Sequence, residues 1–254
     1  MAKKKNSLFK IIAIPVIVLA VAGVTTYFFS WYLNKPRFVR YAEFGIDIPV
    51  NYAIHGIDVS HHNGNIDWKA VKDMQVKNIK MGFAFIKATE GLGRTDGQFR
   101  KNWEKAREAK VPRGAYHFFI ASKSGKAQAE NFIATVQLEK GDLPPVLDVE
   151  TDNGVPPDIL QQRVKDWLQL IEEHYKIKPI IYTYVEFYDY YLGEKFNGYP
   201  LWAAHYLIKD KPRIKRNWIF WQHNDNGRVN GISAAVDFNV FNGDSADFKT
   251  LLVH

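Results

Sequence analysis

Short apolar runs rich in β-branched and aromatic residues alternate with polar or amphipathic stretches from residue 55 almost to the C-terminus. This alternation is typical of βα units, in which helices link parallel strands. Eight such runs occur, which is the number of strands that closes a β/α barrel. The expected strands are HGIDVS (55–60), GFAFIKAT (82–89), RGAYHFF (113–119), PPVLDVE (144–150), KPIIYTY (178–184), YPLWAAHY (199–206), WIFWQH (218–223) and AVDFNVF (235–241).

The stretches between the earlier runs have helical periodicity. The clearest one places Leu160, Val164, Trp167, Leu168 and Ile171 on one face, which should pack on the sheet. The later runs are joined instead by loops rich in Asn, Asp and Gly. We therefore expect the α/β class and an irregular (β/α) barrel with eight strands and fewer than eight outer helices. The expected helices cover about 67–77, 97–110, 124–138, 157–175 and 186–196, with a short one near 245–252.

The N-terminal segment has the composition of a membrane span. No charged residue occurs from Ile11 to Leu33, a stretch long enough to cross a hydrocarbon core of roughly 30 Å. The apolar run continues past Ala20, Val21 and Ala22, a poor match to a signal-peptidase site, and ends in aromatic residues typical of a membrane interface. We expect an uncleaved anchor, with a cleaved and secreted form as the alternative.

The distribution of charge gives this anchor an orientation. The lysines before the span outweigh the charges after it, which puts the N-terminus in the cytoplasm and the rest outside, in the periplasm or at the cell surface. We expect three parts: a transmembrane signal-anchor (1–33), a juxtamembrane linker (34–54), in which Pro36 and Pro49 disfavour continuous helix, and a barrel domain (55–254).

Composition narrows the classes of partner. The net charge is +7, but four of the lysines lie within residues 1–34, so the remainder carries only +3. No run of Lys or Arg alternates with aromatic residues as in a nucleic-acid groove, so we expect no nucleic-acid partner, and we expect a monomer. Cysteine is absent, which excludes disulfides, thiolate metal sites and cysteine nucleophiles.

Acidic residues near the ends of predicted strands are the main candidates for chemistry. Asp148 and Glu150 are two residues apart at the end of an apolar strand, so both side chains project to one side. Two neighbouring carboxylates repel, which raises the pKa of at least one and allows one to stay protonated while the other is ionised. Glycosidic cleavage needs that division of roles. Asp58 and Asp237 lie in two further strands, where they either converge on the same cleft or serve as buried structural acids.

Other chemistries have weaker support. His55, His61, His62 and Asp67 lie close in sequence, but they lack the spacing of known metal motifs. No Gly-x-Ser-x-Gly elbow and no Walker-type glycine loop is present. We therefore expect no metal and no cofactor.

Read in order, the motifs resemble glycoside hydrolase family 25, the Chalaropsis-type lysozymes. The resemblance covers essentially all of residues 55–243, and the ordered set is far more specific than any one motif. It rests on GIDVSHHNGNIDW (56–68), FAFIKATEG (83–91), D-x-x-F-x-x-N-x-x-x-A (96–106), GAYHFF (114–119), PPVLDVE (144–150), PIIYT (179–183), LWAAHY (201–206), WIFWQH (218–223) and G-x-V-x-G-I-x-x-x-V-D-F-N-x-F-x-G (227–243).

The resemblance implies an N-acetylmuramidase that cleaves the β-1,4 bond between N-acetylmuramic acid and N-acetylglucosamine in peptidoglycan glycan strands. It implies that Glu150 is the general acid and Asp148 its partner carboxylate. Either the N-acetyl group of the substrate or a carboxylate would be the nucleophile. The resemblance implies roles in substrate binding for Asp58 and Asp237, and a place in the sugar cleft for Tyr116, Tyr182, Trp202, Tyr206 and Gln222.

The sequence departs from the family pattern at His61, His62 and Asn63, where an aromatic residue, Gln and Gly are common. Two alternatives remain: a glycan-binding module that kept the barrel but lost turnover, and a hydrolase of another N-acetylated glycan. The presence of all four acids favours the active muramidase.

Overall fold

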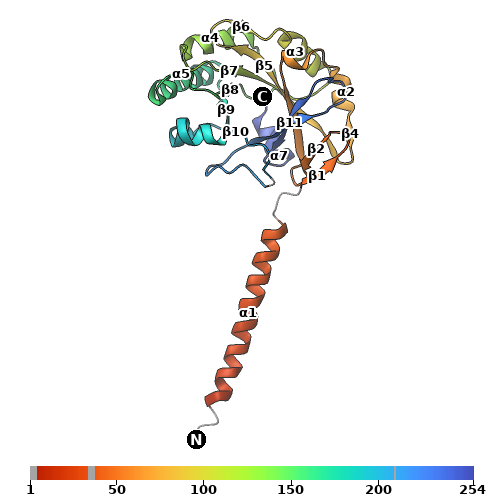
Figure 1. The fold of residues 1–254 in the computed structure, drawn as a ribbon, viewed down its shortest axis with the longest axis vertical. Helices are drawn as coiled ribbons and strands as arrows, with labels where there is room; N and C mark the ends of the chain where they lie inside the picture. Colours follow the sequence, from red (N-terminus) through yellow and green to blue (C-terminus); the bar gives the residue numbers. More distant parts are fainter. Residues whose placement is uncertain (1–4, 34–37, 209) are drawn as a thin grey trace.

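The computed structural model describes residues 5–33, 38–208 and 210–254. Residues 1–4 and 34–37, which include charges that flank the predicted span and part of the predicted linker, lie outside the described residues. Helix α1 (Lys5–Leu33) contains the apolar window Ala13–Tyr32, of mean hydropathy 2.0, which is long and apolar enough to cross a membrane. None of this window is buried against protein, and α1 lies clear of the barrel (Figure 1).

The rest of the chain is a closed eight-stranded barrel, as predicted. Its strands follow the ring order β3-β12-β11-β10-β9-β8-β7-β5, and β3 also pairs with β5 to close the ring. All eight coincide with the predicted apolar runs. The strands are β3 (Ile54–Val59), β5 (Ile79–Glu90), β7 (Arg113–Phe118), β8 (Val146–Asp148), β9 (Ile180–Tyr184), β10 (Leu201–Ala204), β11 (Phe220–Gly227) and β12 (Val236–Phe241).

One strand runs against the others. β12 is antiparallel to both β11 and β3, whereas the remaining neighbours in the ring are parallel. Its direction follows from its connection, because a short loop after β11 can only return the chain in the opposite sense. The start of β12 therefore lies at the same rim as the ends of the other seven strands.

Helices cover the barrel unevenly, which confirms the expected irregular form. Between β10 and β11, and between β11 and β12, the described residues contain no helix. In α5, the predicted stripe from Leu160 to Ile171 is fully buried. The helices around the barrel are α2 (Trp68–Asp73), α3 (Phe99–Glu108), α4 (Gly125–Thr135), α5 (Pro157–Tyr175), α6 (Val185–Phe187) and α7 (Ser245–Leu251). Short 3₁₀ segments cover His61–Asn63 and Gly193–Phe196, and a π-helix covers Tyr188–Leu192.

A small hairpin precedes the barrel in the segment that we expected to be a linker. It consists of β1 (Phe38–Tyr41) and β2 (Ile46–Pro49), which pair antiparallel. The side chains of Phe44, Ile46 and Ile48 are buried with the main core. The packed unit thus begins before residue 55. Two further short strands, β4 (Gln75–Val76) and β6 (Arg94–Thr95), pair with β5 and were not predicted.

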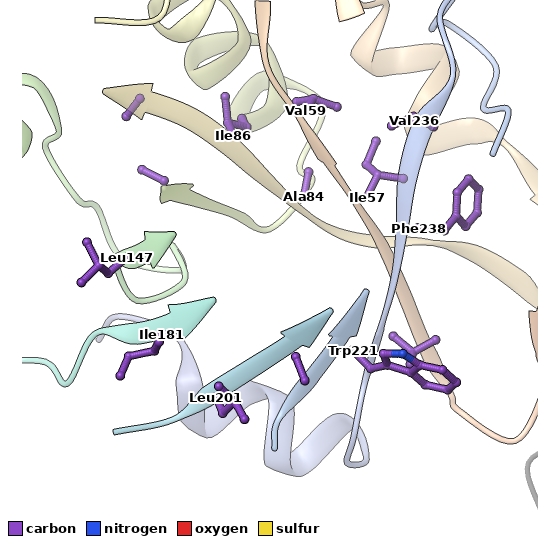
Figure 2. Packing of buried hydrophobic residues seen from close by; sticks show 14 of the residues in the cluster. Ile57, Val59, Ala84, Ile86, Leu147, Ile181, Leu201, Trp221, Val236 and Phe238 are labelled. Atoms are coloured by element: carbon purple, nitrogen blue, oxygen red, sulfur yellow. The ribbon is translucent and has the colours of Figure 1, made fainter. Parts of the chain in front are cut away.

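The core has two layers, because strand side chains alternate between the barrel interior and the space under the helices. Figure 2 shows part of the outer layer, including Ile57, Leu147 and Ile181 from different strands. The interior is mostly aromatic, and Phe248 of α7 packs on Phe83 at the end of the barrel opposite the rim described above.

The interior aromatic rings depend on glycines in neighbouring strands. A Cβ atom at Gly56 would lie 2.6 Å from the Phe83 ring, and one at Gly114 would lie 2.5 Å from the Phe85 ring. Both separations are well below van der Waals contact, so only glycine allows the rings to fill the barrel. Phe85 in turn stacks on Trp202, with ring centroids 4.5 Å apart, and this stack forms the floor beneath the rim.

Candidate active site

Four acidic side chains meet at one rim of the barrel. Asp148 is the last residue of β8, and Glu150 follows two residues later. Asp58 is near the end of β3, and Asp237 is near the start of β12, where the two residues are direct partners across antiparallel strands. All four line one cavity of about 310 Å³.

The structure brings together every residue that the sequence singled out for the sugar cleft. The reversed direction of β12 explains how Asp237, at a strand start, joins acids that stand at strand ends. The cavity also contains side chains that the sequence analysis did not assign to it. The remaining expected residues that line it are Tyr116, Tyr182, Trp202, Tyr206 and Gln222, and the additional ones are Ser60, His62, Lys87 and Phe118.

Asp58 is held by two amide groups. Gln222 Nε2 and Asn239 Nδ2 each donate a hydrogen bond of 2.7 Å to Asp58 Oδ2. Burial raises the pKa of Asp58 to about 6, the two amide hydrogen bonds oppose this shift, and the charge of Glu150 adds to it. Asp58 therefore has a fixed orientation and a pKa close to neutrality.

The two amides are themselves oriented by aromatic side chains. The Tyr182 hydroxyl donates to Gln222 Oε1 over 2.7 Å, and the Tyr206 hydroxyl donates to the same oxygen. Trp202 Nε1 donates to Asn239 Oδ1 over 2.8 Å. These bonds fix which end of each amide faces Asp58, because an amide oxygen that accepts from a hydroxyl or indole leaves its nitrogen to donate.

Asn239 is the member of this network that the sequence analysis missed. It stands within the quoted motif V-D-F-N, two residues after Asp237, so both side chains point to the same side of β12. That alternation was the available signal. Asn239 is fully buried, whereas Asp237 lies further toward the rim.

The Asp148 and Glu150 pair behaves as two interacting acids. Burial raises the pKa of Asp148 well above its ordinary value, and the charge of Glu150 and a side-chain hydrogen bond with it raise the pKa further. Asp148 is only 5% exposed, and its Oδ1 has no hydrogen-bond partner among the described residues. Glu150 is less buried. The sequence predicted that one of the two would have a raised pKa, and the inner member has it.

Asp237 and Tyr116 experience the same negative field. Burial raises the pKa of Asp237 to about 9, and the charges of Asp58, Asp225 and Glu150 add to this shift. Burial also raises the pKa of Tyr116 well above its usual range, and Asp58, Asp148 and Asp237 contribute. Asp237 is therefore protonated at neutral pH in the free protein, and the Tyr116 hydroxyl is a neutral donor among three carboxyl groups.

Lys87 is the one lysine or arginine among the described residues that line the cavity. Its ammonium group pairs with Glu90 at 2.8 Å and lies 4.6 Å from the centroid of the Phe118 ring. Its side chain is only 11% exposed, and its charge lowers the pKa of Asp148, against the larger effects of burial and Glu150. Lys87 thus partly compensates the cluster of acids.

Two of the residues that raised the question of a metal, Asp67 and His61, have other partners. Asp67 accepts hydrogen bonds from the backbone of Lys69 and Ala70 and caps α2. His61 Nδ1 lies 2.6 Å from Asp96 Oδ2. In the described parts of the chain, no group of three or more His, Asp or Glu side chains is placed to hold a metal ion.

Comparison with known proteins agrees with this geometry. The sequence model of the family described as glycosyl hydrolases family 25 matches residues 57–232. This range contains three of the four acids and ends before Asp237. The chain belongs to glycosyl hydrolase family 25. It is therefore a glycoside hydrolase, and the resemblance inferred from the motifs is confirmed.

Individual relatives match most of the length of this chain. Uncharacterized protein YegX of Escherichia coli K12 is 47% identical over 200 residues, which are 79% of this chain and 74% of that protein. Lysozyme M1 of Streptomyces globisporus is 35% identical over 214 residues, 78% of this chain and 71% of that protein. The structure of a family 25 glycosyl hydrolase from Bacillus anthracis matches with a TM-score of 0.73 at 35% identity, and the match covers 80% of this chain and 95% of that one.

The raised pKa of Asp237 predicts a pH-dependent cost to the stability of this family 25 enzyme. The unfolded chain ionises Asp237 near pH 3.8, whereas the folded protein keeps it protonated up to about pH 9, so this group destabilises the fold progressively as pH rises between those values. Asp237→Asn, which mimics the protonated acid, should raise Tm, by roughly 2–4 °C for each kcal/mol gained. The gain should be larger at pH 8 than at pH 5. Thermal unfolding at both pH values checks this, and an equal or larger gain at pH 5 would contradict the assignment.

Proposed function

We propose that this enzyme is a lysozyme-type muramidase that cleaves the β-1,4 bond between N-acetylmuramic acid and N-acetylglucosamine in peptidoglycan. The observation that carries the proposal is the pairing of Asp148 with Glu150 in the cavity of a family 25 glycoside hydrolase. The name of its relative Lysozyme M1 supports the choice of substrate. An acidic cavity lined by aromatic rings suits a neutral sugar that acquires positive charge during cleavage.

In the proposed reaction Glu150 is the general acid. It is less buried than Asp148, so it is better placed to meet a sugar that enters the cavity. The hydrogen bond between the two carboxyl groups lets one proton be shared, with burial favouring Asp148 in the free protein. When the glycosidic oxygen takes the proton from Glu150, the bond to the anomeric carbon breaks and the departing sugar leaves as an alcohol.

Once Glu150 has given its proton to the glycosidic oxygen, positive charge develops at the anomeric carbon, close to the carboxylates of the site. Passage of the shared proton to Glu150 leaves Asp148 ionised beside the anomeric centre. We propose that the N-acetyl carbonyl oxygen of the substrate attacks the anomeric carbon and that Asp148 stabilises the resulting oxazolinium ion. Water then opens this ion and returns a proton to Glu150. Direct attack by the Asp148 carboxylate is the alternative route.

Asp58 and Asp237 are proposed to position the sugar. Asp58 is oriented by Gln222 and Asn239, so its free oxygen can accept a hydrogen bond from a sugar hydroxyl or amide in one fixed direction. Asp237, protonated at neutral pH, can donate one. Tyr116, with its raised pKa, is a further neutral donor.

We also propose that α1 anchors the enzyme, with its N-terminus in the cytoplasm and the barrel outside the cytoplasmic membrane. Its length and composition support a span, and a cell-wall substrate requires an extracytoplasmic barrel. In this arrangement residues 1–33 are the anchor, and the hairpin and barrel are the exposed unit.

Glu150→Gln should lower turnover of purified peptidoglycan by about 10²-fold or more, because it removes the dissociable proton while keeping the shape of the side chain. Tm should stay within a few degrees of the wild type. New reducing ends and released muropeptides from the full-length chain in detergent measure the effect. Glu108→Gln, an exposed glutamate on α3, is the matched control.

Full activity of Glu150→Gln would show that another residue is the acid. Wild-type enzyme that binds peptidoglycan but releases no reducing ends would instead identify a non-hydrolytic binding module. Turnover of a different N-acetylated glycan without turnover of peptidoglycan would identify another substrate.

Lys87→Met should move the pH profile of kcat/KM to higher pH by about one unit, because loss of the Lys87 charge, which lowers the pKa of Asp148, raises the pKa of that carboxyl group further. Glu90 keeps its second partner, Arg94, at 2.8 Å, so the local structure should persist. The profile on peptidoglycan between pH 4 and 9 checks this. An unchanged profile with lower activity would mean that Lys87 acts only through substrate binding.

Full-length protein should remain in the membrane fraction after an alkaline carbonate wash and should keep the mass of the uncleaved chain. Leu19→Arg combined with Ala22→Arg places two charges within the span, at a combined cost of roughly 5–7 kcal/mol, and should release the protein. Wild-type protein that is shortened and soluble would instead support the cleaved form.

A further inference from the structure

The cavity is small compared with the proposed substrate. Its volume of about 310 Å³ is at the low end of the range of about 300–1,000 Å³ for ligand pockets, whereas a peptidoglycan strand is a long polymer of sugars. The strand must therefore leave the cavity along one of its walls. The following inference rests on the proposed function and concerns which wall guides the strand.

The wall that continues β9 carries aromatic side chains outward from the cavity. Tyr182 lines the cavity, and Tyr184, two residues later, points to the same side of the strand, roughly 6.6 Å further toward the rim. Tyr184 is 37% exposed. The charge of Glu150 contributes, after burial, to the raised pKa of its hydroxyl, so this tyrosine lies close to the proposed acid.

From Tyr184 the aromatic rings form a continuous series. Tyr184 meets Phe187 edge to face, with ring centroids 5.6 Å apart, and Phe187 stacks on Tyr191 at 4.5 Å. Tyr191 then meets Tyr190 edge to face at 4.7 Å. Phe187 is buried and supports the series from below, whereas Tyr190 is 76% exposed.

The backbone beneath these rings is unusual and well fixed. Tyr190 and Tyr191 lie in the π-helix Tyr188–Leu192. This conformation is rare in proteins overall, and where it occurs it is often found at functional sites. The Tyr191 hydroxyl donates a 2.8 Å hydrogen bond to Asp152, which lies two residues after Glu150. The aromatic series is therefore tied directly to the segment that holds the proposed acid.

The wall on the far side of the ring has a different character. β3 lies four places from β9 in the ring of eight, and it is followed by Ser60 and His62 in the cavity lining. Its neighbour β5 contributes Lys87, and these side chains mainly offer hydrogen bonds. The exposed rings on this side are the imidazoles of His61 and His62, whereas the exposed rings on the β9 side belong to tyrosines. Stacking of sugar rings is therefore available on the β9 side.

We propose that Tyr184, Tyr190 and Tyr191 form a distal subsite for pyranose rings of the glycan strand beyond the cavity. One face of a pyranose ring presents C–H groups, which are attracted to the negative face of an aromatic ring, while its hydroxyl groups stay in water. An exposed, preordered tyrosine series provides this surface with little loss of side-chain freedom on binding. The subsite adds affinity only for strands long enough to reach it.

Tyr190→Ala in the full-length chain tests the proposal with peptide-free glycan strands of increasing length, from the tetrasaccharide to strands of many repeats. The loss of kcat/KM should grow with strand length and should be roughly three- to tenfold larger on the longest strands than on the tetrasaccharide. Tyr190→Phe keeps the ring and should retain the length dependence of the wild type. Val39→Ala, which truncates an exposed side chain on the hairpin, controls for general effects.

An equal loss at every length, or no loss on long strands, would overturn the subsite. The same result in Tyr190→Ala and Val39→Ala would also overturn it. Failure of the proposed function has a different signature, because the wild type would then release no reducing ends from strands of any length. A binding measurement tests the subsite without relying on turnover. The double variant Glu150→Gln/Tyr190→Ala should be retained on insoluble peptidoglycan more weakly than Glu150→Gln alone, and that result would support the subsite.

Discussion

The crowding of four carboxyl groups at one rim of the barrel is the constraint on which the rest of the site depends. Four carboxyl groups in a small, partly desolvated cavity cannot all be ionised at neutral pH, because their negative charges repel one another. Some of these carboxyl groups therefore keep their protons. Asp148 and Asp237 are the groups that burial and neighbouring charge drive toward the protonated form. Asp58 is kept closer to its ionised form by two amide donors, and Lys87 offsets part of the remaining charge. The site thus holds protons before any substrate arrives.

The barrel stabilises this arrangement by placing rigid, apolar groups beneath it. The Phe85 and Trp202 stack closes the interior below the rim, and Trp202 also orients Asn239, which in turn orients Asp58. Each step is a direct contact, so a displaced interior ring would change the direction of a carboxylate at the rim. Burial of a large side chain contributes about 1.5–3 kcal/mol, which offsets part of the cost of the buried acids.

The sequence predicted the barrel well because the relevant signals are local. Each strand is an apolar run and each large helix an amphipathic stripe, so their existence could be deduced without knowing what they contact. The hairpin at 38–49 was missed because its short, proline-flanked strands become apolar elements only when Phe44 and Ile48 pack on the barrel. The acids and most cavity aromatics were found through motifs. Lys87 and the π-helix were not, because their roles depend on the alignment of strands and on contacts between segments far apart in the chain. Asn239 was missed although its alternation with Asp237 placed it on the same face of β12.

The hairpin also limits how far the enzyme can act if α1 spans the membrane as proposed. Leu33 ends α1 and Phe38 begins the hairpin, so five peptide units, roughly 18 Å at full extension, join the span to the packed unit. Phe38 contacts Trp221 and His223 of β11, so the hairpin is part of the barrel surface and cannot lengthen the tether without losing these contacts. A linker extending to residue 54 would have allowed a reach several times longer. If the proposed membrane span holds, the packed hairpin therefore keeps the cavity close to the membrane surface.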